Sequence, residues 1–295
     1  MKKQPPARPG QSPAGGGDTA ILVVSFGTSY NDSRERTIGA IEGAIASAFP
    51  GYQVRRAFTS PTILRKLARR DGLEIDNVPQ ALDRAAADGV DTLIVQPTHL
   101  MDGLEYARLV EELKSRSHLF ARVALGAPLL TSQEDFQAVL NALSPMAAPY
   151  RDGQTAVVFL GHGTEAASNS VYARLQDMLF RQGLDHCFIG TVEASPALQD
   201  VVSALAGRPF RRVVLIPLMV VAGDHANHDM AGEEEGSWKS VLTRAGYQVE
   251  CLLRGLGENG DIRAIYVSHV RSALAGLGDH TSVPGPGGGE TGHGL

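Results

Sequence analysis

A short motif that follows a buried apolar run occurs twice in this chain, once in each half. Phe26-Gly27-Thr28 follows the first apolar run, and His162-Gly163-Thr164 follows the corresponding run of the second half. Ser60-Pro61 and Ser195-Pro196 each open a helical pattern after the second run of their half. Matching motifs in the same order predict two copies of one folding unit, which restricts the fold more than any other feature.

A third pair of motifs supports this repeat. Pro97 and Pro217 each end the third apolar run of their half. A glycine lies six residues further on in both halves, at Gly103 and Gly223. Since the three pairs keep their order and nearly their spacing, we interpret the chain as a duplicated domain.

Strand-like and helix-like patterns alternate between these motifs. Short β-branched runs such as 20–24 and 155–160 are separated by amphipathic helical patterns such as 33–48. Strands that alternate with helices require parallel sheets that are covered on both faces. We therefore predict an α/β fold of two similar domains, each a roughly four-stranded parallel sheet with helices on both faces.

Composition along the chain suggests where these domains begin and end. The segment 144–153 is rich in proline and turn-forming residues, and it is the predicted boundary between the domains. We predict an N-terminal α/β domain at 19–145 and a C-terminal α/β domain, with a metal site, at 154–280. Residues 1–18 and 281–295 are of low complexity and lack apolar periodicity, so we expect disordered tails there.

Charge and hydropathy exclude several classes of protein. The chain has 27 Lys and Arg against 32 Asp and Glu, a net charge of −5, which does not suit binding to nucleic-acid phosphates. Its apolar stretches are far shorter than the ~18 residues that a membrane span needs. No secretory signal pattern follows Met1. We expect a cytoplasmic protein that binds neither nucleic acid nor a membrane, with Cys187 and Cys251 more consistent with free thiols than with a disulfide.

Chemistry-bearing residues follow the strand ends of the second half. His162, Glu193 and His225 each lie just beyond a predicted strand. The residues at the corresponding positions of the first half are Phe26, Phe58 and Glu105. Ligands of open α/β sheets collect beyond the carboxyl ends of the strands, and two imidazoles with one carboxylate suit Co, Fe, Ni or Zn. The sequence therefore predicts a metal site in the second half that faces an apolar wall from the first.

Each of these three residues also has a purely structural interpretation. His162 lies in a Gly-His-Gly turn and is compatible with a helix cap, and Glu193 with a carboxylate at a helix N-terminus. His225 is compatible with a loop histidine bonded to its neighbours. Their joint placement at neighbouring strand ends favours the shared metal site. Asp224 and Asp229 fit loop or cap positions better than ligand positions.

His99 is a further candidate near the predicted cleft. It ends the segment Gln96-Pro97-Thr98-His99 at the close of the third strand. It either contacts a substrate or handles a proton there, or it packs as a loop histidine. The glycine-rich turn at 161–164 has neither a Walker pattern nor a full G-x-G-x-x-G signature, so nucleotide binding is not expected.

Several of these segments together resemble the anaerobic (class II) sirohydrochlorin cobaltochelatases of cobalamin synthesis, which are related in fold to the ferrochelatases. The resemblance covers about residues 19–275 and is specific as a set. The matching segments are 25–29, 96–99 with Gly103, Glu105 and Tyr106, 161–164, 190–193, 217–226 with Asp229 and Met230, and 255–259. It implies a two-domain, chelatase-like fold with a cleft.

The resemblance also implies a reaction and a ligand set. The reaction is ATP-independent insertion of Co2+ into sirohydrochlorin, with no cofactor beyond the substrate metal. The metal-binding and catalytic residues of the family correspond to His162, Glu193 and His225. His228 departs from the family pattern, and a helix there would place it on one face with His225. Whether His228 joins His225 at the metal is left open.

The substrate-binding residues predicted around this centre are Phe26, Thr28, Ser29, Phe58, His99 and Glu105. Phe26 and Phe58 would supply an apolar face for the macrocycle. Helix N-termini near Thr28 and Ser29 would receive the substrate carboxylates.

Alternatives remain open at this level. The same ligand set suits a ferrochelatase or a nickel chelatase that acts on the same or a related tetrapyrrole. A non-catalytic tetrapyrrole or metal carrier would use the same cleft, whereas a two-lobed solute-binding module is disfavoured by the missing signal peptide. A homo-oligomer is compatible with the sequence, which does not define the oligomeric state.

Overall fold

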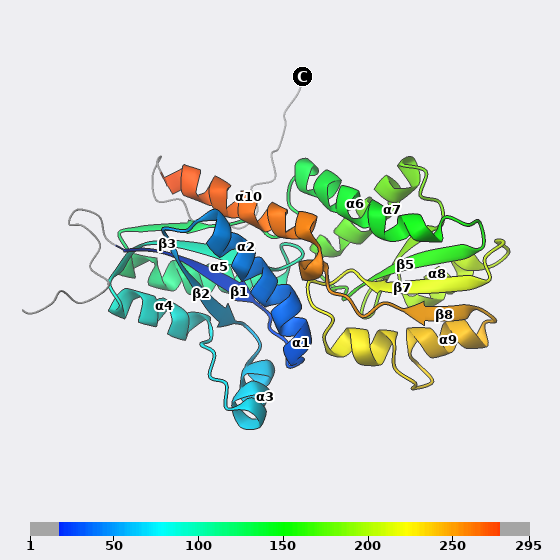
Figure 1. The fold of residues 1–295 in the computed structure, drawn as a ribbon, viewed down its shortest axis with the longest axis horizontal. Coiled ribbons are helices and arrows are strands. Elements are labelled where there is room, and N and C mark those ends of the chain that lie inside the picture. Colours follow the sequence, from blue (N-terminus) through cyan, green and yellow to red (C-terminus); the bar gives the residue numbers. More distant parts are fainter. Residues whose placement is uncertain (1–17, 278–295) are drawn as a thin grey trace, which may run out of the picture.

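Two parallel sheets organise the molecule (Figure 1), and the computed structural model describes residues 18–277. The first sheet has the strand order β2-β1-β3-β4 and the second has the order β6-β5-β7-β8. The strands of the first sheet are β1 (Asp18–Ser25), β2 (Gln53–Phe58), β3 (Val90–Pro97) and β4 (Arg122–Leu125). The strands of the second are β5 (Thr155–Gly161), β6 (Cys187–Thr191), β7 (Arg212–Pro217) and β8 (Gln248–Cys251). The predicted pair of four-stranded parallel sheets is confirmed.

Helices connect the strands and cover the sheets. Those of the first half are α1 (Asn31–Arg34), which continues through the π-helical turn η1 (Glu35–Gly39) into α2 (Ala40–Ala48), then α3 (Pro61–Asp71), α4 (Val78–Ala87), α5 (Leu104–Arg116) and α6 (Gln133–Ala147). Those of the second half are α7 (Ser170–Arg181), α8 (Leu198–Leu205), the π-helical turn η5 (Ala226–Met230), α9 (Trp238–Arg244) and α10 (Gly260–Gly276). Four short 3-10 turns complete the description: η2 (Ser117–Leu119), η3 (Ala148–Tyr150), η4 (Ala167–Asn169) and η6 (Leu256–Glu258).

The two halves also match at the level of single backbone hydrogen bonds. The amide of Thr98 donates to the carbonyl of Val24 at the end of the first sheet. The amide of Leu218 donates to the carbonyl of Leu160 at the same place in the second sheet. These bonds align Pro97 with Pro217, as the repeat predicts.

Successive side chains of the central strands pack into different hydrophobic cores. Ile21 and Val23 of β1 point into a core that also contains Val157 and Phe159 of β5. The residues between them in β1, such as Leu22, pack into a separate core of the first half. Because successive side chains of a strand point to opposite faces, one face of each sheet contributes to a core that the two halves share.

The helices at the ends of the two halves cross over. α6, the last helix of the first half, packs against α7, where the Arg174 guanidinium lies 3.9 Å from the centre of the Phe136 ring. α10 packs against α2, α6 and β3, and it lies over the first sheet in Figure 1. The buried Tyr266 hydroxyl of α10 donates to the carbonyl of Thr98 at 2.9 Å.

α10 lies within the predicted C-terminal domain at 154–280, yet it packs against elements of the first half. Ile265, Tyr266 and Val270 form the buried face of α10, and they join the shared core rather than the core of the second sheet alone. An apolar helix face packs wherever apolar surface is available, and here the first sheet offers it.

The chain ends are only partly described. β1 begins at Asp18, which falls in the predicted tail at 1–18, while the rest of that tail and the predicted tail at 281–295 lie outside the described residues. Within residues 18–277, no helix has the length and apolar character that a membrane crossing requires. Cys187 and Cys251 carry free thiols, as predicted.

Candidate metal centre

Three neighbouring strands of the second sheet each position one candidate ligand. His162 directly follows β5, and Glu193 lies two residues beyond the end of β6. His225 lies immediately before the turn η5, in the connection that follows β7. Because β5 lies between β6 and β7, the carboxyl ends of these strands place His162 between the other two residues.

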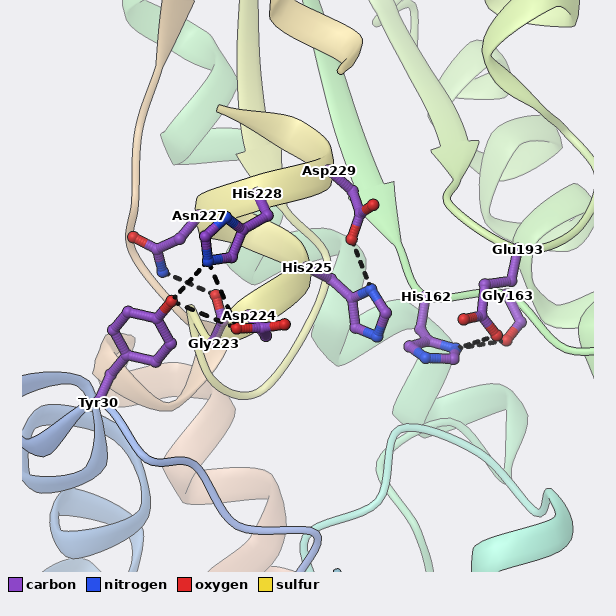
Figure 2. A network of polar contacts seen from close by, with 10 residues as sticks. All are labelled: Tyr30, His162, Gly163, Glu193, Gly223, Asp224, His225, Asn227, His228 and Asp229. Carbon is purple, nitrogen blue, oxygen red and sulfur yellow. Dashed lines mark hydrogen bonds and ion pairs between the residues drawn. The ribbon is translucent and has the colours of Figure 1, made fainter. Parts of the chain in front are cut away.

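The three side chains converge. One ligand atom from each of His162, Glu193 and His225 lies within 4.8 Å of the others. His162 Nδ1 is 3.7 Å from Glu193 Oε2, and all three side chains are partly exposed. Figure 2 shows both imidazoles directed toward the same space, with the Glu193 carboxylate beside His162. Two imidazoles and a carboxylate in one place are a ligand set for a borderline divalent metal.

Hydrogen bonds from Nδ1 orient both imidazoles. His225 Nδ1 lies 2.8 Å from Asp229 Oδ2, one helical turn further on. His162 Nδ1 lies 2.8 Å from the carbonyl oxygen of Gly163. Since both partners are acceptors, each Nδ1 donates its proton and each Nε2 keeps a free lone pair. This is the arrangement by which outer carboxylates and carbonyls orient metal-binding histidines.

The family model described as cobalt chelatase (CbiK) matches residues 19–275, which includes both sheets and all three converging residues. This chain belongs to the cobalt chelatase family.

Two similar proteins are both named as sirohydrochlorin cobaltochelatases. The sirohydrochlorin cobaltochelatase of Salmonella typhimurium is 41% identical over 255 residues, covering 86% of this chain and 96% of the relative. The sirohydrochlorin cobaltochelatase CbiKC of Nitratidesulfovibrio vulgaris is 34% identical over 261 residues, covering 88% of this chain and 92% of the relative.

Solved structures support the fold of this cobalt chelatase. SirB from Bacillus subtilis with Fe3+ superimposes with a TM-score of 0.61 and 16% identity, over 90% of this chain and 98% of that one. CbiX, described as the terminal enzyme of siroheme biosynthesis in denitrifying bacteria, gives a TM-score of 0.54 and 18% identity, over 86% of this chain and 99% of that one. At these identities the likeness shows the chelatase-like fold alone.

Loops after the strands of the first half approach loops after the strands of the second half. A β-carbon on Gly223, after β7, would lie 3.4 Å from the Thr28 hydroxyl oxygen, after β1. Reciprocally, a β-carbon on Gly103, after β3, would lie 3.7 Å from the Ser168 hydroxyl oxygen, after β5. The loops at the strand ends of the two halves therefore contact each other in a matching way, as a duplicated pair would.

Two large apolar side chains are exposed at these first-half strand ends. Phe26, directly after β1, is 50% exposed, and Leu104, at the start of α5, is 63% exposed. Glu105 follows Leu104 in the first turn of α5, partly exposed, and accepts a hydrogen bond from Arg108 at 2.8 Å. Both side chains are therefore available for apolar contact with a ligand.

Phe58 does not belong to this surface. The structure buries it completely with Ile38 and Leu67, so the prediction that it faces the macrocycle is wrong. The backbone register gives the reason. The amide of Ser60 donates to the carbonyl of Phe26, and the amide of Glu193 donates to the carbonyl of His162. Glu193 therefore corresponds to Ser60, and Phe58 corresponds to the buried end of β6.

Thr28 and Ser29 are also buried, so in this structure neither presents its hydroxyl to a ligand. The Thr28 hydroxyl oxygen lies 3.3 Å from the amide nitrogen of Tyr30, which donates to it. The carbonyl of Ser29 accepts a hydrogen bond from Arg70 at 2.6 Å. These contacts stabilise the loop after β1. They disagree with the predicted role of Thr28 and Ser29 in binding substrate carboxylates.

His99 lies in the loop after β3 with both ring nitrogens buried and without a hydrogen-bond partner. Burial lowers the pKa of His99 to about 4, against a smaller opposite influence of Glu105. The imidazole is therefore neutral near pH 7, which disfavours the proton-accepting role weighed for it from the sequence.

His228 points away from the three converging residues. Its Nε2 lies 3.4 Å from the Tyr30 hydroxyl and 3.6 Å from Asp224 Oδ1, on the far side of the turn from the His225 ring (Figure 2). The π-helical turn η5 separates the two imidazoles, so they do not share a face. Sequence reasoning missed Tyr30 altogether and treated Asp229 as a cap, although its spacing of four from His225 was a usable signal.

Proposed function

We propose that this cobalt chelatase inserts Co2+ into sirohydrochlorin in cobalamin biosynthesis. The observation that carries the proposal is the convergence of His162, Glu193 and His225 within 4.8 Å at the ends of three neighbouring strands. Membership of the family and the names of the two relatives support the choice of metal and macrocycle.

In this proposal, the three converging residues hold the substrate Co2+. The Nε2 atoms of His162 and His225 donate lone pairs, while Asp229 and the Gly163 carbonyl keep the rings in the required tautomer. The Glu193 carboxylate offsets part of the charge of the cation. Three protein ligands leave coordination positions free for the pyrrole nitrogens of the incoming macrocycle.

The macrocycle then meets the metal from the first half. Phe26 and Leu104 supply apolar surface for one face of the ring, in place of the buried Phe58. Bending of the ring against this surface would turn the pyrrole lone pairs toward the metal.

Two protons must leave as the metal enters. Free sirohydrochlorin carries two pyrrole N–H protons, so its reaction with Co2+ yields the cobalt complex and two protons. In this proposal, Glu193 on the metal side and Glu105 on the opposite side are the carboxylates that accept them. No electrons are transferred, and the reaction consumes no nucleotide.

Anaerobic insertion assays with Co2+, Fe2+ and Ni2+ in parallel test the proposal. We expect multiple turnovers with Co2+ at substoichiometric enzyme, and loss of most enzyme-dependent insertion in His162→Ala. His118→Ala, which removes an exposed imidazole at η2, serves as the matched control. Faster insertion of Fe2+ or Ni2+ would favour the ferrochelatase or nickel chelatase alternative, and a single stoichiometric turnover would favour a carrier.

A further inference from the structure

A second group of polar side chains meets on the outer side of the turn that carries His225. The Tyr30 hydroxyl lies 3.4 Å from Asp224 Oδ1 and 3.4 Å from His228 Nε2. His228 Nε2 in turn lies 3.6 Å from Asp224 Oδ1. Figure 2 shows these three side chains directed toward one point, on the side of η5 opposite the His225 ring.

The spacing of these atoms is long for hydrogen bonds and suits a shared cation. Hydrogen bonds between such groups are normally about 2.7–3.0 Å long. Ligands that each lie about 2.1 Å from one divalent metal are separated from each other by roughly 3.0–3.4 Å. Two of the three distances are 3.4 Å, at the upper end of that range, and the third is 3.6 Å, slightly above it, so the three atoms define a nearly equilateral triangle.

We propose that Tyr30, Asp224 and His228 form a second divalent-cation site, separate from His162, Glu193 and His225. One imidazole, one carboxylate and one neutral phenol oxygen suit a borderline ion such as Co2+, Ni2+ or Zn2+ rather than Ca2+ or Mg2+. Within residues 18–277, no Lys or Arg forms an ion pair with Asp224, so its charge is available to a cation.

The placement of this second site gives it a structural role. Asp224 and His228 lie one turn apart around η5, whereas Tyr30 comes from the first half of the chain, directly before α1. A cation held by all three would tie the first half to the turn that positions His225. Asp224 and His228 are mostly exposed, so we expect weaker binding than at the first centre. The inference does not rest on the proposed function, because the metal alone is the ligand.

Equilibrium dialysis of the untagged full chain against Co2+ tests the second site. We expect two Co2+ per chain in the unmodified protein, one in His162→Ala and none in His162→Ala/His228→Ala. His162 is chosen because it lies on a different element and its removal leaves the turn with Asp224 and His228 intact. His162→Ala/His118→Ala is the matched control and should still bind one Co2+. Circular dichroism establishes that each variant is folded.

Tyr30→Phe in the His162→Ala background tests the contribution of the first half. It removes only the hydroxyl, and we expect affinity for the remaining Co2+ to fall about 10-fold. A single Co2+ in the unmodified protein that folded His162→Ala no longer binds, or one Co2+ retained in folded His162→Ala/His228→Ala, would overturn the second site. Unchanged affinity in Tyr30→Phe would overturn the link between the halves. Failure of cobalt insertion would leave all these results unaffected, so the two proposals fail separately.

Discussion

The imidazole rings of His162 and His225 stand edge to face, with 4.4 Å between their centroids and 89° between their planes. They come from different strand ends, yet they are close enough to bind one ion together. This closeness makes the two residues energetically dependent on each other.

We therefore predict that the effects of removing these histidines are not additive. His162→Ala and His225→Ala should each lower Co2+ affinity at this centre by at least about 100-fold, and the double variant should be little worse than either one. Competition titrations with a chromophoric chelator measure these affinities. Additive losses in the double variant would mean that the histidines bind separate ions.

Asp229 is expected to act through His225. Asp229→Asn removes the charge that holds the Nδ1 proton of His225, and we expect Co2+ affinity to fall by about 10–100-fold without loss of the fold. Asp177→Asn, which removes an exposed carboxylate paired with Arg181 one turn later, is the matched control. Equal affinities in the two variants would contradict the orienting role of Asp229.

Substitution of Phe26 should affect tetrapyrrole binding, whereas substitution of Phe58 should affect stability. Phe26→Ala should weaken binding of the tetrapyrrole while Co2+ affinity and stability stay nearly unchanged, because the ring is half-exposed and is not one of the three converging residues. Phe58→Ala should instead lower the free energy of unfolding by about 3–5 kcal/mol, since it leaves a cavity. Fluorescence binding and urea unfolding distinguish them, and a stability loss in Phe26→Ala of the size expected for Phe58→Ala would refute this division.

His99 should make stability depend on pH. Its pKa is about 4 in the folded protein and ordinarily 6.5, so the unfolded chain binds more protons between these values. Stability should therefore fall as the pH decreases from 6.5 to 4 and this contribution should level off below. His99→Leu should lose less stability over that range in urea unfolding. Parallel pH profiles of the two proteins would contradict the prediction.

Asp135 should make stability depend on pH in a more acidic range than His99 does. Burial acts to raise the pKa of Asp135, but hydrogen bonds from the Ser132 amide and the His269 ring outweigh it, so the pKa lies below 3.8. The stabilisation is thus present above about pH 4 and is lost as the pH falls through the folded pKa. Asp135→Asn should cost roughly 1–3 kcal/mol at pH 6, and less as the pH falls through the folded pKa of Asp135. A constant difference across this range in urea unfolding would show that the charge is unimportant.

The sequence was sufficient to predict the parts that follow from periodicity and repetition. Alternating patterns predicted the two sheets, and the motifs after the strands predicted that His162, Glu193 and His225 lie close together. Parallel strands align their carboxyl ends, so residues there become neighbours whatever their separation in the chain.

The misplaced residues have local causes. Aligning the two Ser-Pro pairs paired Phe58 with Glu193, yet the segment between strand end and Ser-Pro is two residues longer in the second half, which shifts the correspondence. Tyr30 contacts Asp224 and His228 across the two halves, and no periodicity within one element signals such a contact. The apolar periodicity of α10 likewise predicts that one face of this helix is buried, but it does not indicate which sheet covers that face.

The crossing of α6 and α10 has a consequence for how the protein folds. Each half ends in a helix that packs against the other half, so each half has one core of its own and depends on the other half to complete the shared core. Isolated halves should be incompletely folded, and a chain cleaved between α6 and β5 should refold only when both fragments are mixed. The intact protein should then unfold in one cooperative transition, although its sequence is that of two tandem copies.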